Sequence, residues 1–446
     1  MSVAEQLAKA AVSSDTFQAR RDRYLSRAIQ RVFDLHFVEG RGSLLFTETG
    51  ERYVDLFAGI AVHNLGHRHP KVVQAAMEQM NRLWHLCLNY GMYAPAVDLA
   101  ERLASLTPDP LDTVFFGNSG AEAVEGALKL ARLATGRPAL IAFRGAFHGR
   151  TMGALSMTAS NSRYRRGFEP LLPEVYHVNY PYPLWSPYGR DPEAAAAGAL
   201  RELEDLFRWE VSPERVAAIL VEPVLGEGGY VPAPPQFLQG LRRLCDQYGI
   251  LLILDEVQSG FGRTGKLFAF EHAGVVPDIL VMGKALGAGL PLSAFMASRE
   301  LHDRFPAGSH GSTYGGNAVA CAAALAGLDV LYEEGLIERA ARIGRQLLER
   351  LKALEELPGV AEVRGLGCMI GVEFVDRDGR PDPELTEEVV KGCLERHVLI
   401  LSCGAHKNVV RLIPALNIPD DILEEGVGVF ETVIRQAAAR RGRGRS

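Results

Sequence analysis

The sequence predicts an α/β fold in which a mostly parallel sheet of seven strands carries helices on both faces and a smaller α+β domain follows. Two observations support this prediction. Short, almost fully apolar runs alternate with segments of helical periodicity through the middle of the chain, as expected for parallel strands buried on both faces. After about residue 325 the pattern changes to a long charged helical stretch and further short strands, which indicates a second domain.

Seven runs are predicted as strands of the main sheet, because each is rich in aliphatic or aromatic residues and ends near turn residues. In chain order they are Thr113–Phe116, Ala139–Phe143, Glu174–Val178, Ala217–Glu222, Ile250–Asp255, Asp278–Met282 and Leu292–Ala297. Between them, apolar residues at helical spacing predict one helix that ends at Gly136 and another that ends at Gly249, since glycine is favoured just after a helix.

Three parts of the chain are expected. Residues 1–55 form an N-terminal segment that has no room in the main sheet and packs with the small domain; residues 56–325 form the large domain, and residues 326–446 the small one. In the small domain we expect a helix over Ile337–Leu357 and a final helix from Pro419. Strands are expected near Met369–Phe374, Leu399–Ser402 and Val409–Ile413.

The composition of the 446 residues, 47% hydrophobic and 23% charged, is ordinary for an enzyme. A net charge of −6 argues against nucleic acid as the main partner, because such a surface needs clustered basic residues. The six cysteines form no Cys-x-x-Cys pair and no apolar signal segment follows Met1, so a cytoplasmic protein with reduced thiols is expected. No apolar run reaches the roughly 18 residues of a membrane span, so no membrane contact is expected.

One stretch superficially resembles parts of an ATPase. An aliphatic strand runs into Asp255, and a glycine loop follows that ends at Gly265-Lys266. A phosphate-binding loop needs Ser or Thr after its lysine, because that hydroxyl holds magnesium, and Leu267 stands there instead. A P-loop ATPase is therefore kept only as an alternative.

Polar residues stand where predicted strands end, which is where ligands bind in open α/β sheets. A buried Asp255 must meet a cation or a hydrogen-bond donor, in a functional site, a structural ion pair or a helix cap. Lys284 leads from the next strand into a glycine-rich turn, where a lysine can lose its proton and attack a carbonyl. The helix that starts near Ala121 has free N–H groups that can bind a phosphate, with an ordinary capping turn as the alternative. Phosphate anchor, carboxylate and amine together are the parts of a pyridoxal phosphate site.

Six motifs follow one another along the chain. They are Asn118–Ala123, Ala146–Thr151, Glu222–Gly229, Asp255–Gly265, Gly283–Gly289 and Ser312–Asn317. In these motifs, and over nearly its whole length, the sequence resembles the class III aminotransferases of pyridoxal-phosphate fold type I, and most closely the 4-aminobutyrate aminotransferases. The resemblance implies the fold of that group, pyridoxal 5′-phosphate as cofactor and a ping-pong transamination.

The resemblance also implies how the cofactor is bound. Lys284 would form the Schiff base and carry the proton between substrate and cofactor, and Asp255 would keep the pyridine nitrogen protonated. Val257 and Phe147 would cover the two faces of the ring, and Gln258 would reach the ring hydroxyl. Each of the last three has a plainer alternative as core or loop residue, but their register with Lys284 and Asp255 favours the functional interpretation.

The phosphate end of the cofactor is implied in the same way. Ser119, Gly120 and Ala121 would bind the phosphate at the helix start. Thr313 would come from a partner subunit, because members of the family build the site at a dimer interface. We therefore expect a homodimer or a larger homo-oligomer with shared active sites.

Four residues are implied on the substrate side. Arg150 resembles the arginine that binds a substrate carboxylate, a role suited to a planar bidentate donor. Glu227 and Arg411 resemble a gating pair, in which Glu227 covers Arg411 when an ω-amine donor binds and moves away for the carboxylate of an oxo acid. A fixed structural salt bridge is the alternative. Ile60 stands where 4-aminobutyrate aminotransferases carry an isoleucine, which favours an uncharged donor chain.

No metal is predicted. His63 and His67 are four residues apart, but Gly66 and Pro70 nearby are turn residues and no fourth ligand is evident, so these are expected to be turn histidines.

The predicted function is transamination between an ω-amino acid or primary amine, such as 4-aminobutyrate, and a 2-oxo acid, either 2-oxoglutarate or pyruvate. Alternatives on the same scaffold are an (S)-selective amine transaminase, an ornithine or acetylornithine aminotransferase, and an amino-acid racemase or epimerase. Outside it, the alternatives are the P-loop ATPase and a catalytically silent cofactor-binding protein.

Overall fold

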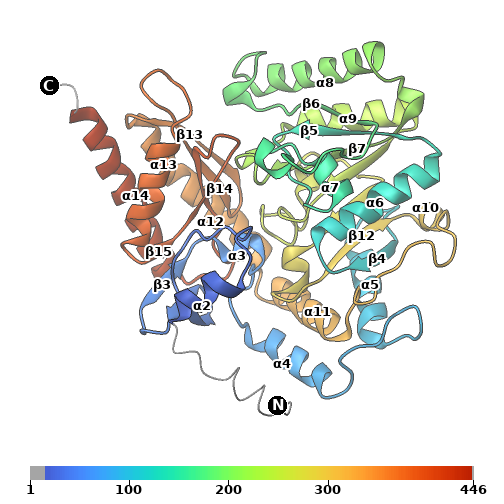
Figure 1. Cartoon of the computed structure of the whole chain (residues 1–446), viewed down its shortest axis with the longest axis horizontal. Coiled ribbons are helices and arrows are strands. Elements are labelled where there is room, and N and C mark those ends of the chain that lie inside the picture. Colours follow the sequence, from blue (N-terminus) through green and yellow to red (C-terminus); the bar gives the residue numbers. More distant parts are fainter. Residues whose placement is uncertain (1–15, 444–446) are drawn as a thin grey trace. The chain divides into compact units, whose positions relative to one another are not determined.

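The computed structural model describes residues 16–443 (Figure 1). The chain forms two compact units, the smaller of which comprises, among the described residues, 16–39 and 46–51. It contains α2 (Phe17–Tyr24), which begins where the Thr16 hydroxyl accepts a hydrogen bond from the Ala19 N–H. Phe17 stacks on His36, whose Nδ1 lies 2.8 Å from a carboxylate oxygen of Glu48. Strands β1 (Phe37–Arg41) and β2 (Leu44–Thr47) each include residues of both units.

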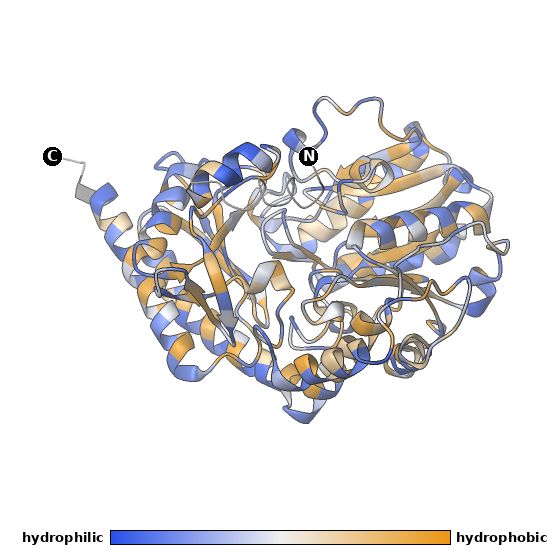
Figure 2. Ribbon diagram, turned by 60° about the horizontal axis from the view of Figure 1, so that its bottom comes forward, coloured by the Kyte–Doolittle hydropathy of each residue, from blue (hydrophilic) through white to orange (hydrophobic). Residues whose placement is uncertain are grey.

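The larger unit, residues 40–45 and 52–446, contains a seven-stranded sheet in the order β4-β12-β11-β10-β7-β5-β6. The seven predicted strands are confirmed as β4 (Thr113–Gly117), β5 (Ala139–Arg144), β6 (Val175–Asn179), β7 (Val216–Val221), β10 (Leu251–Asp255), β11 (Ile279–Met282) and β12 (Ser293–Ala297). β12 is antiparallel to both neighbours and all other pairs are parallel. Figure 2 shows these strands mainly in the colour of hydrophobic residues.

Helices cover both faces of this sheet. On β10, Ile253 packs into one buried apolar cluster with α6 (Gly120–Thr135), whereas Leu252 and Leu254 pack into the other with α9 (Pro235–Tyr248). Because successive side chains of a strand point to opposite faces, the two helices lie on opposite sides of the sheet. The predicted arrangement of helices on both faces is thereby confirmed.

The two helix ends predicted at glycines are also confirmed. Gly136 follows α6 with φ 67° and Gly249 follows α9 with φ 62°. These are left-handed conformations that glycine adopts without the steric cost of a Cβ.

The C-terminal part contains a second, antiparallel sheet in the order β13-β14-β17-β16. Its elements are α12 (Leu336–Lys352), β13 (Val360–Leu366), β14 (Met369–Phe374), α13 (Pro383–Leu394), β16 (Leu401–Cys403), β17 (Val409–Leu412) and α14 (Asp420–Arg443). The helix predicted over Ile337–Leu357 is too long, because α12 ends at Lys352 and one 3-10 turn follows. Strand β13 was not predicted.

β3 (Arg52–Asp55) pairs in parallel with β15 (Val398–Leu399), through Val54 opposite Val398 and Asp55 opposite Leu399. The division of the chain at residues 56 and 325 stays a prediction. The remaining elements named below are α3 (Ala58–Ala61), α4 (Pro70–Met80), α5 (Ala94–Leu106), α7 (Met152–Met157), α8 (Pro192–Trp209) and α11 (Ala318–Glu333). Within residues 16–443, no helix has both the length and the apolar character needed to cross a bilayer.

Helix α12 packs so closely on the turn after β13 that Gly344 leaves no space for a side chain. A Cβ at this position would lie 2.2 Å from the backbone oxygen of Gly367. We expect Gly344→Ala to lower the free energy of unfolding by about 2–3 kcal/mol, because backbone has to move. Gly428→Ala on α14 is the matched control: no atom lies within 4 Å of the added Cβ, so about 1 kcal/mol of stabilisation is expected. Urea denaturation of the two variants measures both effects, and equal midpoints would contradict this packing.

Candidate active site

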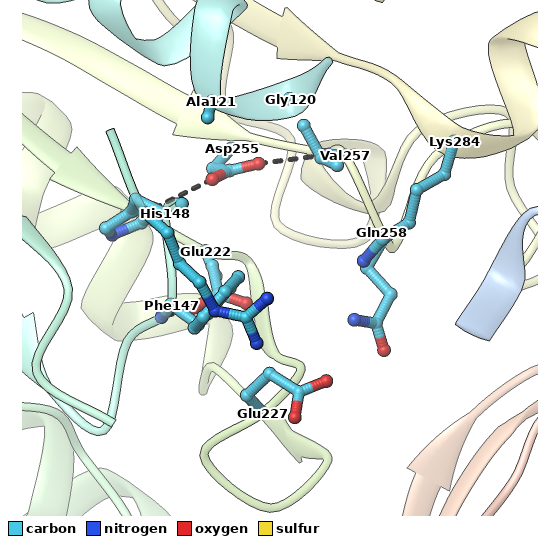
Figure 3. Close-up of a pocket in the computed structure, with 12 residues that line it drawn as sticks. Gly120, Ala121, Phe147, His148, Glu222, Glu227, Asp255, Val257, Gln258 and Lys284 are labelled. Carbon is cyan, nitrogen blue, oxygen red and sulfur yellow. Dashed lines mark hydrogen bonds and ion pairs between the residues drawn. The ribbon is translucent and has the colours of Figure 1, made fainter. Parts of the chain in front are cut away.

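A cavity of about 300 Å³ lies at the carboxyl ends of β10 and β11 (Figure 3). All predicted site residues except Ser119, Ile60, Thr313 and Arg411 line it. Its lining consists of Gly120, Ala121, Phe147, His148, Gly149, Arg150, Glu222, Glu227, Asp255, Val257, Gln258 and Lys284. The structure therefore gathers residues from five of the six sequence motifs, spread over more than 160 positions, in one place.

Asp255 ends β10 and is buried, with both carboxylate oxygens engaged. One accepts a hydrogen bond from the Val257 N–H at 3.0 Å, and the other lies 2.7 Å from Nδ1 of His148. His148 is buried too, and its Nε2 has no hydrogen-bond partner among the described residues. Nδ1 therefore donates to the carboxylate. No role was predicted for His148, although it stands directly after Phe147 in one of the motifs.

Lys284 follows β11 and begins a short 3-10 helix, η5 (Lys284–Gly287), with φ 46°. A lysine in this left-handed region is strained, and such strain occurs mainly at functional sites. Burial lowers the pKa of the Lys284 amine below the usual value of lysine, against the charges of Glu227 and Asp255, which raise it. The amine is thus more readily deprotonated than a surface lysine and faces the same cavity as Asp255, from the neighbouring strand.

The start of α6 forms the third side of the cavity. The Ser119 hydroxyl accepts a hydrogen bond from the Glu122 N–H at 3.3 Å, which places the helix start at Gly120 and Ala121. A Cβ on Gly120 would lie 2.9 Å from Cγ1 of Val257, so only glycine fits this approach. Pyridoxal phosphate requires a helix start that can bind its phosphate, a carboxylate for its ring nitrogen and an amine for its aldehyde. The residues of this cavity fit these three requirements.

Glu222, which follows β7, holds two loops of the site together. Its carboxylate accepts hydrogen bonds from the Phe147 N–H at 2.8 Å and from the Gly226 N–H at 2.9 Å. Burial raises the pKa of Glu222 above the usual range, and the charge of Asp255 adds to this. Glu222 thus fixes the loop that carries Phe147 relative to the loop that carries Glu227.

Arg150 lies at the exposed rim of the cavity. Its guanidinium carbon is 5.3 Å from the ring centroid of Phe147 and 5.0 Å from that of Tyr164. Contact with both rings restricts the guanidinium while leaving its N–H groups available, as a carboxylate-binding arginine requires.

Arg411 lies on β17, is buried, and pairs with Glu227: its Nη1 is 2.5 Å from a Glu227 oxygen. Burial opposes ionisation of Glu227, yet the Arg411 guanidinium holds the pKa of this carboxyl below its usual range. The pair is therefore ionised, with Glu227 in the cavity wall and Arg411 covered behind it. The two residues predicted as a gate are brought together.

Ile60 does not line the cavity. It lies in α3, where Ala58, Gly59, Ile60 and Ala61 all have φ between 46° and 63°, so this turn is left-handed. Asp55 holds the turn by accepting hydrogen bonds from the N–H groups of Phe57 and Ala58, and its other oxygen lies 2.8 Å from Nε2 of His67. Contact of Ile60 with substrate remains a prediction. Within residues 16–443, no group of three or more His, Cys, Asp or Glu side chains is arranged to hold a metal.

Thr313 is exposed and lies outside the cavity lining. The neighbouring Ser312 hydroxyl accepts a hydrogen bond from the Asn118 side chain at 3.1 Å, so this loop lies beside the start of α6.

The glycine loop that resembles an ATPase motif is packed into the protein. Arg263 is fully buried and donates to the Cys368 carbonyl at 3.1 Å and to Oδ1 of Asn64 at 2.5 Å. A Cβ on Gly265 would lie 2.8 Å from Ala341 of α12. Lys266, by contrast, is exposed. The loop is therefore packed against α12 and the Cys368 backbone and offers no open cradle for a phosphate.

Comparison with known proteins gives one consistent result. The model of the family "Aminotransferase class-III" matches residues 24–434. The probable 4-aminobutyrate aminotransferase of Bacillus subtilis (strain 168) is 38% identical over 430 residues, 96% of this chain and 99% of that protein. The acetylornithine aminotransferase of Methanopyrus kandleri is 43% identical over 414 residues, covering 93% and 97% of the two chains. Among solved structures, the omega transaminase from Pseudomonas jessenii superimposes with a TM-score of 0.91 at 28% identity, over 96% of this chain and all of the other.

Proposed function

This chain belongs to the class III aminotransferases, and from that premise we propose that it transfers an amino group from an ω-amino acid, such as 4-aminobutyrate, to a 2-oxo acid. As a member of this family it is a transaminase that uses pyridoxal 5′-phosphate. The choice of donor and acceptor is the part that we propose, and it depends on the residues around the cavity.

Bound pyridoxal phosphate supplies an electron sink that stabilises negative charge on the substrate carbon. Around it, Asp255 would keep a proton on the ring nitrogen, and the hydrogen bond from His148 at 2.7 Å holds this carboxylate in place. The Lys284 amine would take the proton from the substrate carbon and return it later, a task that suits an amine with a lowered pKa. Gly120 and Ala121 would bind the phosphate, and Phe147 and Val257 would confine the ring.

The Glu227–Arg411 pair is the observation that carries the choice of donor. In the closed pair the arginine charge is neutralised, so the wall beside Lys284 does not favour an α-carboxylate. An ω-amino acid such as 4-aminobutyrate carries no carboxylate next to the carbon that bears its amine. Its distant carboxylate would bind Arg150 at the rim. A 2-oxo acid carries a carboxylate next to its carbonyl, and it would replace Glu227 as the partner of Arg411. One cavity then serves both half-reactions.

An acetylornithine-type donor is a second candidate. The relative from Methanopyrus kandleri that shares 43% of its residues carries the name acetylornithine aminotransferase. Such a donor also presents a terminal amine, with its carboxylate far from the reacting carbon, so the same closed pair and the same Arg150 would accept it.

The half-reactions test this proposal. The purified holoenzyme is mixed with one donor at a time, without acceptor, and loss of the visible cofactor band is followed. We expect 4-aminobutyrate and N-acetylornithine to react at least about 10-fold faster than L-alanine and (S)-1-phenylethylamine, the difference of one well-placed carboxylate contact. A faster reaction with (S)-1-phenylethylamine would assign the protein to the amine transaminases. Racemisation of alanine without amino transfer would assign it to the racemases.

We also propose that the protein is a homodimer in which Thr313 completes the partner's phosphate site. Large apolar side chains gather on the segment after α4 and on the loop of Thr313: Trp84 is 66% exposed, Tyr90 88%, Met92 76% and Tyr314 60%. A surface of this kind is typical of an interface between subunits. Since Thr313 lies on the same loop as Tyr314, a second copy that covers this surface would also receive the threonine.

All six cysteines are free thiols in the structure, and all except Cys87 are buried. Unpaired buried thiols are typical of proteins kept in a reducing compartment. We therefore retain the cytoplasm as the proposed location.

A further inference from the structure

Tyr230 stands at the end of the loop that carries Glu227, and its backbone is strained. It has φ 55° although it is a bulky aromatic residue, and its side chain is fully buried. A left-handed aromatic residue costs free energy and persists only where its surroundings fix it. Sequence reasoning gave this residue no role.

A buried arginine fixes the backbone at this point. Arg364 on β13 donates to the Gly229 carbonyl through Nη2 at 2.6 Å and through Nε at 3.2 Å. A second contact comes from within the loop, where the Tyr230 N–H donates to the Gly226 carbonyl at 3.4 Å. The direction of the Tyr230 side chain is therefore set by the folded loop.

On one side, the Tyr230 hydroxyl donates to Oε1 of Gln258 at 2.7 Å. Gln258 lines the cavity (Figure 3). A Cβ on Gly226 would lie 2.6 Å from Nε2, so the loop packs closely against this amide and only glycine leaves room for it. The tyrosine holds the acceptor end, which leaves the donor end for a ligand in the cavity.

On the other side, the ring of Tyr230 lies against the gate. The guanidinium carbon of Arg411 is 5.9 Å from the ring centroid, within the range of a cation–π contact. Because Arg411 is buried, this contact replaces part of the water that the cation has lost.

We propose that Tyr230 is a positioning residue that acts on both the cofactor and the oxo-acid substrate. Its hydroxyl orients Gln258 so that Nε2 donates to the ring oxygen of the cofactor, and its ring supports Arg411 for the carboxylate of the oxo acid. This inference rests on the roles proposed above for Gln258 and Arg411, and it adds the residue that orders them together.

Two substitutions separate the two contacts. Tyr230→Phe removes only the hydroxyl, and we expect the Kd for pyridoxal phosphate to rise by about 5-fold, the usual effect of one lost hydrogen bond. The pH midpoint of the visible cofactor band should move upward by about half a unit, because the anionic ring oxygen loses an ordered donor. The KM for 2-oxoglutarate should stay within about 2-fold, since the ring still faces Arg411. Tyr230→Leu should raise that KM by about 5-fold as well, because the cation–π contact is lost.

The Gln258→Ala variant is the protein in which the effect of the Tyr230 hydroxyl is tested a second time. If the hydroxyl acts through Gln258, adding Tyr230→Phe to Gln258→Ala leaves both the Kd and the pH midpoint at the values of Gln258→Ala alone. Additive losses would overturn the proposal, and so would a Gln258→Ala protein with wild-type Kd and midpoint. Tyr180→Phe is the matched control, since it removes another buried tyrosine hydroxyl, bonded to the Glu222 carbonyl at 3.1 Å, and is expected to change neither value. The substrate proposal fails separately, through the donor half-reactions of the wild-type protein, and those results leave this comparison unaffected.

Discussion

Lys284→Ala is expected to lower kcat/KM for transamination between 4-aminobutyrate and 2-oxoglutarate by at least about 10⁴-fold, because both the covalent attachment of the cofactor and the proton transfer are lost. This lysine lines the cavity, is strained at φ 46° and has its pKa lowered by burial. The visible band of the lysine-bound cofactor should disappear at the same time. Steady-state kinetics and absorption spectra of the purified variant measure both effects.

Lys266 is a suitable control position, because it is also a lysine and lies only 18 positions before Lys284 (284 − 266 = 18). It is exposed on the glycine loop and outside the cavity. Lys266→Ala should retain activity within about 2-fold, as is usual for exposed positions. An inactive Lys266→Ala beside an active Lys284→Ala would contradict the assignment of the amine and would favour a phosphate-binding role for the loop.

The second large effect is expected at the gate. Arg411→Ala should slow the half-reaction with 2-oxoglutarate by about 100- to 1000-fold, because a buried hydrogen-bonded carboxylate partner contributes about 3–4 kcal/mol. The half-reaction with 4-aminobutyrate should fall by less than about 5-fold, because its carboxylate is expected at Arg150 rather than Arg411. Stopped-flow measurement of the two half-reactions separates these values. Equal losses in both would show that the pair is a structural salt bridge.

Glu227→Gln completes this test, because it removes the covering charge and keeps the arginine. With Arg411 permanently available, L-glutamate should gain relative to 4-aminobutyrate as donor by about 10-fold, equivalent to about 1.4 kcal/mol. Thermal unfolding of both variants shows whether the loss of one charge of a buried pair has also destabilised the fold. A glutamate to 4-aminobutyrate ratio unchanged from wild type would contradict the gate.

The main sheet was predictable because its strands are buried on both faces, and such strands read as short apolar runs wherever they occur. The antiparallel direction of β12 was not predictable, since an apolar run looks the same in a parallel and in an antiparallel strand. Strand β13 was missed because it carries Glu362 and Arg364. Arg364 is tolerated inside the protein because it is paired with Glu362 and with Glu373, each at 2.6 Å, and Glu373 comes from the next strand.

In the same way, some residues of the candidate site were predictable from the sequence and others were not. Lys284, Asp255 and the helix start near Ala121 follow from residue types, since each is placed by a strand end or helix start in its own stretch of sequence. Val257 and Gln258 were implied only by the family resemblance. His148 and Tyr230 belong to the same motifs but were not given a role. What identifies them is a contact: one with Asp255 across 107 residues and one with Gln258 across 28.

The sequence identifies the family and the cofactor through motifs that resemble the class III aminotransferases, and it predicts Lys284 as the reactive amine because local patterns of apolar and polar residues decide which side chains end a strand. Which polar groups meet is visible only in the folded chain: Arg411 with Glu227 across 184 residues, His148 with Asp255, and Tyr230 with Gln258. A buried donor or acceptor is stable only with a partner at hydrogen-bonding distance, and that distance exists only after the chain has packed. The glycine loop that ends at Gly265-Lys266 shows both levels, since its spacing suggests a phosphate site while its buried Arg263 and the packing of Gly265 against α12 leave no open cradle there.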